Sequence, residues 1–403
     1  MIDVLIIAHY CGDFNQGSNN RFNYIAELLA YHEFKVELVT SDYSHTKKEK
    51  RPVVNSMPGY KVTLISEPAY RKNISLRRFY SHYVMSKNLK KYLIKRKKPD
   101  VIYCSVPSLD IAFETAKYAK RKNVKFIIDV QDLWPEAFRM VLNIPIITDI
   151  IYSYFGIKAN YIYRTADEIF AVSQTYVDRA LAASKKCSKG HCVYIGIDIK
   201  GFDAFVTLGN EILKPPGEIW VAYVGTLGHS YDITCVIDAI TILNDKGINN
   251  IKFIVMGDGP LKEYFIDYAR SKDLYCEFTG WMDYSVMVRL LASCDIAVNP
   301  ITRGAAQSII NKHADYAAAG LPVLNTQECA EYRKLIEDYQ AGYNCESNNP
   351  KDLAENILDL CYDDDLRLAI GKNHRRLAEE KFDRANTYVS IVRLLQNNLP
   401  MIK

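Results

Sequence analysis

The sequence predicts an α/β protein built from two doubly wound parallel sheets. Three observations support this prediction. First, apolar runs of strand length alternate with stretches whose apolar residues have helical spacing. Second, the runs are apolar at successive positions, as in parallel strands that are covered on both faces. Third, the 403 residues, of which 49% are hydrophobic and 24% charged, suit two globular domains.

The expected strands fall into two groups. Those of the first half are residues 3–9, 35–40, 60–65, 100–105, 124–129, 168–173 and 192–196. Those of the second half are residues 219–225, 251–257, 275–280, 295–300 and 321–325. The alternation breaks at 200–218, where Pro215, Pro216 and Gly217 stand together. We therefore expect domains at 1–200 and 201–380, followed by a helical segment at 381–403 that crosses back to the first domain.

Composition argues against several classes of protein. The net charge of +4 is small for this length, which gives no support to a whole-protein nucleic-acid interaction. No run of about 18 apolar residues could span a membrane, and the first ten residues do not read as a signal peptide. Ten cysteines are scattered without a framework, as in a protein with reduced thiols. We expect a cytoplasmic protein.

Ligands of such sheets bind beyond the carboxyl ends of the strands, so the loops there are the first places to search. After the first strand, Gly17 would let the backbone approach a ligand, and Ser18 or Asn19 could cap the following helix. The pattern is not G-x-G-x-x-G, which disfavours a dinucleotide. An ordinary strand–helix loop is the alternative.

The fifth strand is followed by Gln131 and Asp132, in the sequence DVQDLWPE. Asp132 lies just past the strand end, where a ligand would bind. Helix-start chemistry is the alternative, because aspartate is a favoured cap and proline suits the first helical turn. Trp134 could serve packing alone.

In the second half, two further loops follow strands. The first, YVGTLG, holds Gly225 and Thr226, and the second, MGDGP, holds Asp258. Their glycines permit close backbone approach, and an acid favours a helix N-terminus. Taken alone, each is more typical of a turn than of a site.

Residues 304–323 read GAAQSIINKHADYAAAGLPV and place Lys312 and Asp315 on one face of a helix, near its N-terminal end. The lysine could neutralise a phosphate, and the carboxylate could accept the hydroxyls of a sugar ring. A surface ion pair is the alternative interpretation. Arg303 and Gln307 lie in the same segment, so four polar side chains would gather at one strand end.

Several segments in the same order resemble the retaining glycosyltransferases of family four, whose GT-B architecture has two facing Rossmann-like domains. The segments are the loop Gly17–Asn20, AVSQTY, YIGID, YVGTLG, MGDGP, FTGW, CDIAVNP and INKHADYAAAGLPV. The resemblance covers almost the full length. The motifs DLWPE and N-K-x-x-D-Y-x-A-x-G-x-P resemble those of the bacterial branch of the family, which builds O-antigen and capsule repeat units.

The resemblance implies a cleft that binds a nucleotide sugar, with uridine as the expected base. It implies that Asp315 holds the ribose, that Lys312 neutralises the diphosphate, and that Gln131 and Asp132 lie near the acceptor. Gln307 would face the donor sugar. The expected catalytic residues are Asp132, Gln131, Gln307 and Lys312. The expected donor-binding residues are Gly17, Ser18, Gly225, Thr226, Asp258, Thr279, Gly280, Trp281, Arg303, Ser308, Lys312 and Asp315.

Three departures from the family pattern concern the site. Gln307 stands where the family has an acid, so it cannot act as a base or a nucleophile. Asp315 is one methylene shorter than the usual glutamate. The arginine and lysine that often follow G-T-L-G are absent, which leaves Arg303 and Lys312 to supply the positive charge.

The expected reaction transfers a hexose, or an amino- or deoxy-hexose, with retention of the anomeric configuration. No pair of carboxylates is placed for a double displacement, so we expect the leaving diphosphate to be stabilised directly. No D-x-D motif follows a strand, because Asp363–Asp365 lies among late helices. We therefore expect no metal or other cofactor.

Residues 71–98 contain eleven Lys and Arg and no acid, interleaved with aromatic residues. This pattern predicts a basic amphipathic helix that contacts anionic lipid at the inner face of the plasma membrane, near a lipid-linked saccharide acceptor. A solvated helix whose aromatic face packs on the first domain is the alternative. Nucleic acid is disfavoured as a partner, because no binding module for it is recognisable.

Two other functions remain open at this stage. A nucleotide-sugar 2-epimerase would share the architecture, but it would need paired acids where Gln307 stands. A non-catalytic subunit that binds a nucleotide sugar, or a partner transferase, is compatible with the missing acid.

Overall fold

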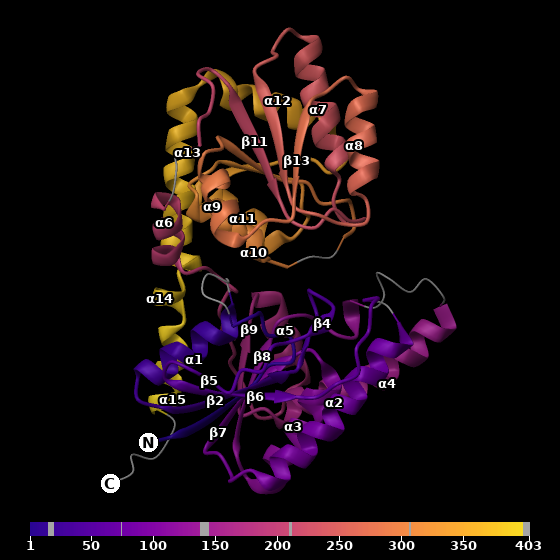
Figure 1. The fold of residues 1–403 in the computed structure, drawn as a ribbon, viewed down its shortest axis with the longest axis vertical. Coiled ribbons are helices and arrows are strands. Elements are labelled where there is room, and N and C mark those ends of the chain that lie inside the picture. Colours follow the sequence, from indigo (N-terminus) through magenta and orange to yellow (C-terminus); the bar gives the residue numbers. More distant parts are fainter. Residues whose placement is uncertain (15–19, 74, 138–144, 209–211, 306–307, 398–403) are drawn as a thin grey trace. The chain divides into compact units, whose positions relative to one another are not determined.

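The computed structural model describes residues 1–14, 20–73, 75–137, 145–208, 212–305 and 308–397. The chain divides into two compact units (Figure 1). Unit 1 comprises Met1–Tyr194 and Tyr388–Lys403, and unit 2 comprises Ile195–Thr387. Each unit is an α/β structure around its own sheet, so the predicted fold class is confirmed.

Unit 1 has a sheet of eight strands in the order β10-β9-β8-β7-β1-β2-β6-β5. All its pairings are parallel except that of β5 with β6. A separate antiparallel pair, β3 and β4, lies outside this sheet. The strands are β1 Asp3–Ile7, β2 Lys35–Ser41, β3 Tyr43–Ser44, β4 Glu49–Lys50, β5 Ser56–Met57, β6 Tyr60–Ile65, β7 Val101–Val106, β8 Lys125–Val130, β9 Glu168–Ala171 and β10 His191–Cys192.

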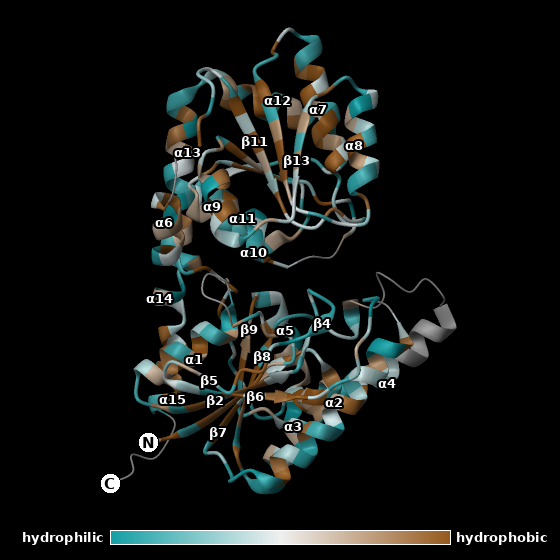
Figure 2. Ribbon diagram, viewed as in Figure 1, coloured by the Kyte–Doolittle hydropathy of each residue, from teal (hydrophilic) through white to brown (hydrophobic). Residues whose placement is uncertain are grey.

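Helices cover both faces of this sheet, because alternate side chains of each strand enter different cores. Leu5 and Ile7 of β1 pack with α2, α3, α4 and α5, whereas Val4 and Ile6 pack with α1 and α15. Figure 2 shows these strands largely in the hydrophobic colour. The helices are α1 Arg21–Tyr31, α2 Leu76–Lys95, α3 Leu109–Lys122, α4 Pro145–Thr165, α5 Gln174–Ala183 and α15 Val389–Asn397.

Unit 2 has a sheet of six parallel strands in the order β13-β12-β11-β14-β15-β16. The strands are β11 Ile219–Val224, β12 Ile251–Met256, β13 Cys276–Gly280, β14 Ile296–Asn299, β15 Val323–Asn325 and β16 Gly342–Asn344. The helical elements are α6 Ile199–Thr207, α7 Ile233–Asp245, α8 Lys262–Ser271, α9 Tyr284–Ala292, α10 Asn311–Ala318, α11 Ala330–Tyr339, α12 Pro350–Tyr362, α13 Asp364–Leu377, the π-helix η2 Ala378–Phe382 and α14 Arg384–Thr387.

The boundaries of the units differ from the expected 200 and 380. The first lies between Tyr194 and Ile195, because α6 packs against α9 and Asp203 of α6 forms an ion pair with Arg375. The second lies after Thr387, because Arg384 donates hydrogen bonds to the carbonyl oxygens of Ile195 and Gly196. The helical tail therefore joins unit 1 seven residues later than expected.

Short strands were the least predictable elements. In place of the expected strand 192–196 the structure has only the two-residue β10. Strands β3, β4, β5 and β16 have two or three residues each, which is too short for an apolar periodicity to reveal them.

The N-cap of α1 is Asn20, whose side chain accepts hydrogen bonds from the amides of Phe22 and Asn23. It is neither Ser18 nor Asn19.

A buried ion pair ties the parts of unit 1 together. Nε of Arg21 lies 2.9 Å from Oδ2 of Asp129, and Nη2 donates to Oδ1 at 3.2 Å. Nη1 donates to the hydroxyl of Tyr388 and to the carbonyl oxygens of Val193 and Tyr194. One guanidinium thus joins α1, β8, the segment after β10 and the returning tail. Burying it is tolerated because each charge meets its counter-charge and hydrogen-bond partners.

Arg21→Met should therefore destabilise the protein by about 3–5 kcal/mol, because Asp129 would remain buried without its counter-charge. The free energy of unfolding in urea measures this. The double variant Arg21→Met/Asp129→Asn is the control and should recover part of the loss. A loss below about 1 kcal/mol for Arg21→Met would contradict the role given to the pair.

Candidate functional site

Helix α10 lies at the carboxyl ends of the central strands of unit 2. The hydroxyl of Tyr316 accepts a hydrogen bond from the amide of Val224 at 2.8 Å and donates to the carbonyl oxygen of Val298 at 3.1 Å. It therefore fixes α10 against the last residue of β11 and against β14. These carboxyl ends are where parallel α/β sheets bind ligands.

Lys312, in the first turn of α10, is 6% exposed, and its ammonium group has no hydrogen-bond partner among the described residues. Nζ lies over two ring faces, 4.2 Å from the centroid of Tyr223 and 4.1 Å from that of Tyr231. Burial holds the pKa of this lysine well below its usual value. The two rings attract the cation but supply no counter-charge.

The glycines around Lys312 bring two loops together. Gly225 follows β11 directly, and a Cβ on it would lie 3.1 Å from Nζ of Lys312. Gly257 follows β12 at a φ of +149°, and a Cβ there would lie 1.9 Å from the carbonyl oxygen of Gly225. Only glycine fits at 257, so the two backbones touch beside the lysine.

Asp315 is also buried, at 4% exposed, but it does not pair with Lys312. Its Oδ1 accepts a hydrogen bond of 2.8 Å from the hydroxyl of Tyr284, the first residue of α9. Burial raises the pKa of this carboxyl to about 6, while the Tyr284 hydrogen bond and the charge of Arg384 act in the opposite direction. The surface ion-pair interpretation of these two residues is therefore wrong.

The other donor-site candidates of unit 2 differ in how open they are. Thr226, Asp258 and Trp281 are exposed, Trp281 at 70%. Gly280 has a φ of +75°, and the hydroxyl of Thr279 bonds only to backbone carbonyls. The hydroxyl of Ser308 is buried without a partner among the described residues, like the amine of Lys312.

Arg303 lies apart from the role expected for it. Its side chain is largely exposed, and its Nε lies 3.8 Å from Oε1 of Glu328. Both line a cavity of about 590 Å³ with Arg333, Glu346 and Asp352. The acids of this cavity already balance the charge of Arg303, which leaves Lys312 as the uncompensated cation near β11.

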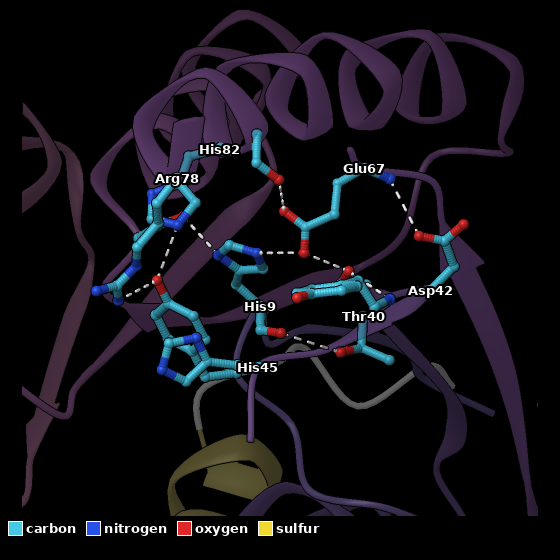
Figure 3. Close-up of polar contacts among 12 residues, drawn as sticks. His9, Thr40, Asp42, His45, Glu67, Arg78 and His82 are labelled. Atoms are coloured by element: carbon cyan, nitrogen blue, oxygen red, sulfur yellow. Dashed lines mark hydrogen bonds and ion pairs between the residues drawn. The ribbon is translucent and has the colours of Figure 1, made fainter. Parts of the chain in front are cut away.

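Unit 1 has a polar cluster at the carboxyl ends of its own strands (Figure 3). His9 follows β1, and its Nε2 lies 3.0 Å from Oε1 of Glu67, while its Nδ1 lies 2.9 Å from the hydroxyl of Ser108. The hydroxyls of Ser41 and Ser81 also donate to the Glu67 carboxylate. Burial acts to raise the pKa of Glu67, but the electrostatic interaction with His9 and the hydrogen bonds from His9, Ser41 and Ser81 hold it at about 2.

A second group of side chains lies beside His9, on the side away from Glu67. Figure 3 shows Arg78 and His45 there. Arg78 donates to the hydroxyl of Tyr10 at 2.8 Å, and that hydroxyl lies 3.0 Å from Nε2 of His82. The His82 ring is stacked with Trp134 at a centroid distance of 5.9 Å.

The two acceptor-side candidates are placed differently. Asp132 accepts from the indole nitrogen of Trp134 at 3.1 Å, and burial raises the pKa of its carboxyl. It belongs to the group around Arg78, whose charge opposes that rise. Gln131 instead donates to the buried Asp129 at 2.7 Å, so it supports the structural ion pair with Arg21.

Three expected site residues, Gly17, Ser18 and Gln307, lie outside the described residues. Within the described ranges, no three His, Cys, Asp or Glu side chains form a group that could hold a metal ion. No described helix combines the length and apolar character needed to cross a bilayer.

The comparisons with known proteins concern both the second unit and the whole chain. Residues 208–377 match the family described as glycosyl transferases group 1. An uncharacterized glycosyltransferase of Methanocaldococcus jannaschii, MJ1178, is 25% identical over 231 residues. That match covers 56% of this chain and 59% of the relative, so it spans about three fifths of the relative's length.

Solved structures match the chain over almost its full length. Sucrose-phosphate synthase (tll1590) from Thermosynechococcus elongatus has a TM-score of 0.77 at 15% identity, covering 99% of both chains. Anabaena Alr3699/HepE, solved in complex with UDP, has a TM-score of 0.70 at 14% identity, covering 98% of this chain and all of the other. At this identity the likeness concerns the fold, which is GT-B as the sequence predicts.

Glu67→Gln should change how the stability of unit 1 depends on pH. The folded-state pKa of about 2 lies below the ordinary 4.5, so the carboxylate stabilises the fold above pH 4.5. This contribution is lost as the pH falls from about 4.5 through about 2, and it amounts to roughly 3 kcal/mol. Urea unfolding of the wild type and the variant across this range measures it.

The control variant is Glu33→Gln, which removes an exposed carboxylate of the same unit. It should follow the wild-type pH profile. If Glu67→Gln and Glu33→Gln lost stability in parallel with the wild type down to pH 2, the hydrogen bonds to Glu67 would not carry the energy assigned to them.

Proposed function

We propose that the protein is a retaining glycosyltransferase, because residues 208–377 match the glycosyl transferases group 1 family and the fold is GT-B. It transfers a hexose, or an amino- or deoxy-hexose, from a UDP-linked donor. The acceptor is a lipid-linked saccharide of bacterial surface polysaccharide synthesis. The observation that carries the proposal is the buried, unpaired ammonium of Lys312.

Lys312 is placed to meet the diphosphate of the donor. An uncompensated buried charge is unfavourable, and an arriving phosphate supplies the missing counter-charge and hydrogen-bond acceptors. The ammonium lies beside Gly225, where the absence of a side chain leaves the backbone open to a ligand. The buried hydroxyl of Ser308, three residues before α10, is a second donor without a partner among the described residues.

Asp315 is placed to hold the ribose. One of its oxygens accepts from Tyr284, and a carboxylate can accept further hydrogen bonds from a vicinal diol. With a pKa of about 6 it is mostly ionised at neutral pH and can accept from both hydroxyls. The exposed indole of Trp281, just after β13, offers a surface on which the base can stack.

The choice of uridine rests on two supports. The sequence resembles a branch that uses UDP-sugars, and the structurally similar Anabaena protein was solved in complex with UDP. Neither support fixes the sugar itself.

The chemistry we propose relies on leaving-group stabilisation. A double displacement needs two carboxylates about 5 Å apart that flank the anomeric carbon. Gln307 occupies the position of one acid, and Asp315 is engaged with Tyr284. The bond between the anomeric carbon and the diphosphate oxygen therefore breaks while the acceptor oxygen bonds to that carbon from the same face, and the proton of the acceptor hydroxyl passes to the departing diphosphate. The charge that develops on the diphosphate is stabilised by Lys312, so we propose a metal-independent reaction.

The acceptor side of the proposal rests on α2. Leu76, Tyr80, Tyr83 and Ile94 are exposed, and they alternate along one face of the helix with Lys87, Lys90, Lys91 and Lys95. The opposite face, with Met85, Leu89 and Leu93, is buried in the core of unit 1. The exposed face has the composition of helices that lie on anionic membranes. We propose peripheral attachment of a cytoplasmic enzyme to the inner face of the plasma membrane.

Lys312→Met should stabilise the free protein and abolish its response to UDP. Removing a buried amine that has no hydrogen-bond partner among the described residues is expected to raise the free energy of unfolding by about 1–3 kcal/mol. UDP in the presence of EDTA should raise the melting temperature of the wild type, since it binds only the folded state, and should leave the variant unchanged. Differential scanning fluorimetry measures both effects.

Lys246→Met removes an exposed lysine of the same unit and is the matched control. It should retain the response to UDP and melt like the wild type. A Lys312→Met protein that is less stable than the wild type, or that UDP still stabilises, would contradict the assignment.

The membrane proposal predicts a loss of vesicle binding on removing charge from α2. Changing Lys87, Lys90, Lys91 and Lys95 to Gln should weaken binding to phosphatidylglycerol vesicles at low salt by roughly 10²- to 10³-fold, at about 1 kcal/mol per lysine. Co-sedimentation measures it. Changing Lys246, Lys351, Lys372 and Lys381 of unit 2 to Gln removes the same charge and should have no such effect. Equal weakening by both sets would overturn the specific role of α2.

A further inference from the structure

A cationic group in unit 1 forms no ion pair with a described carboxylate, although it lies partly buried in the cluster around Tyr10. Its members are Arg78 of α2 and Lys48 of the turn between β3 and β4. Both converge on Asn73. Nη1 of Arg78 donates to the carbonyl oxygen of Asn73 at 2.7 Å, and Nζ of Lys48 donates to its side-chain oxygen. Neither cation takes part in an ion pair with a described carboxylate.

The surroundings of Arg78 orient its guanidinium without neutralising it. The group lies over the rings of Trp134 and Tyr10, with centroid distances of 5.0 and 5.5 Å. Its Nη2 donates to Tyr10, and its Nε is buried without a partner among the described residues. A planar fork that is held by aromatic faces and keeps a free donor is suited to a phosphate group.

The field at this position is positive. Burial, together with the charges of Arg78 and Lys48, lowers the pKa of His45 to about 3, so His45 is neutral; its Nδ1 lies 2.7 Å from the hydroxyl of Tyr70. The pKa of Lys48 is likewise lowered, first by burial and then by Arg78. Two acids lie nearby. Glu67 is saturated by hydrogen bonds from His9, Ser41 and Ser81, and Asp132 accepts from the amide of Leu133 and the indole of Trp134 without forming an ion pair with Arg78.

We propose that Arg78 and Lys48 form an anion site in unit 1 that binds a phosphate or diphosphate ester of the acceptor. The inference rests on the proposed glycosyltransferase function, which it deepens by naming the chemical class that links the saccharide to its lipid. Arg71 and Lys72, in the segment before α2, and Arg77, in its first turn, are exposed and add to the positive field that attracts an anion from solution.

Inorganic pyrophosphate is a direct probe of the site. The experiment uses the full-length Lys312→Met protein, so that anion binding in unit 2 does not contribute. Pyrophosphate should raise the melting temperature of this protein, and adding Arg78→Gln or Lys48→Gln should weaken its binding by roughly 10- to 100-fold, the value of one charge-assisted contact. Arg78→Lys keeps the charge but not the two parallel donors of the guanidinium, so its affinity for pyrophosphate should lie between those of the Lys312→Met protein and the Arg78→Gln variant.

Arg77→Gln, also in the Lys312→Met protein, is the matched control. Arg77 is the neighbouring arginine, is exposed, and donates to the carbonyl oxygen of Ala69. It should leave pyrophosphate binding within about twofold. Equal binding by the Arg78→Gln and Arg77→Gln proteins, with both folded, would overturn the proposal.

A vesicle arm separates the acceptor from bulk lipid as the source of the phosphate. Phosphatidylglycerol vesicles should bind the Arg78→Gln protein and the wild type equally, because the exposed face of α2 does not include Arg78. A selective loss of vesicle binding in Arg78→Gln would assign the site to lipid headgroups and would also overturn the proposal.

A kinetic arm tests the same site during transfer. Arg78→Gln should raise the KM for a diphosphate-linked acceptor by roughly 10- to 100-fold and leave the KM for the UDP-sugar unchanged. A phosphate-free alkyl glycoside should be used equally well by the variant and the wild type. If no transfer were found with any donor, the proposed function would fail, while the pyrophosphate result would still decide the anion site.

Discussion

The proposed function depends above all on one physical constraint: the side-chain amine of Lys312 is buried without an anion beside it. Tyr316 fixes α10 at the carboxyl ends of β11 and β14, and this places the lysine between two tyrosine rings beside Gly225. The free protein therefore holds a basic amine in a position where only a ligand can supply the counter-charge that its protonated form needs. A site of this kind lowers the free energy of unfolding of the free protein, and ligand binding then relieves the unfavourable burial.

The contrast with Arg21 shows why this lysine is not a structural residue. Arg21 is equally buried, yet its guanidinium meets Asp129, Tyr388 and two backbone carbonyls, so every donor group is used to join parts of unit 1. A buried charge that meets a counter-charge, as Arg21 does, joins secondary-structure elements to one another. Where they are unmatched, at Lys312 and at Arg78, they lie at the carboxyl ends of parallel strands, which is the binding edge of such sheets.

The repeating pattern of apolar runs was enough to predict both sheets and their class, because strands covered on two faces are apolar at successive positions. Lys312 and Asp315 could be singled out because charged residues are rare in so alanine-rich a helix. Their burial and separate partners could not, since Tyr223, Tyr231 and Tyr284 come from other elements. The cluster of His9, Glu67 and Arg78 was missed for the same reason: its members lie far apart in the sequence. Polar residues next to strand ends, such as His9 after β1, were the available signal.

The most direct test of the central claim is whether UDP binding protonates a lysine. Isothermal titration calorimetry with UDP at pH 8.5, in two buffers of different ionisation enthalpy, measures the protons taken up. At this pH Asp315, with a pKa of about 6, and the phosphates are already ionised. The lowered pKa of Lys312 predicts net proton uptake, because the diphosphate restores the charged form. Binding of UDP with no proton uptake would contradict the claim that the free protein holds this lysine uncompensated until its ligand arrives.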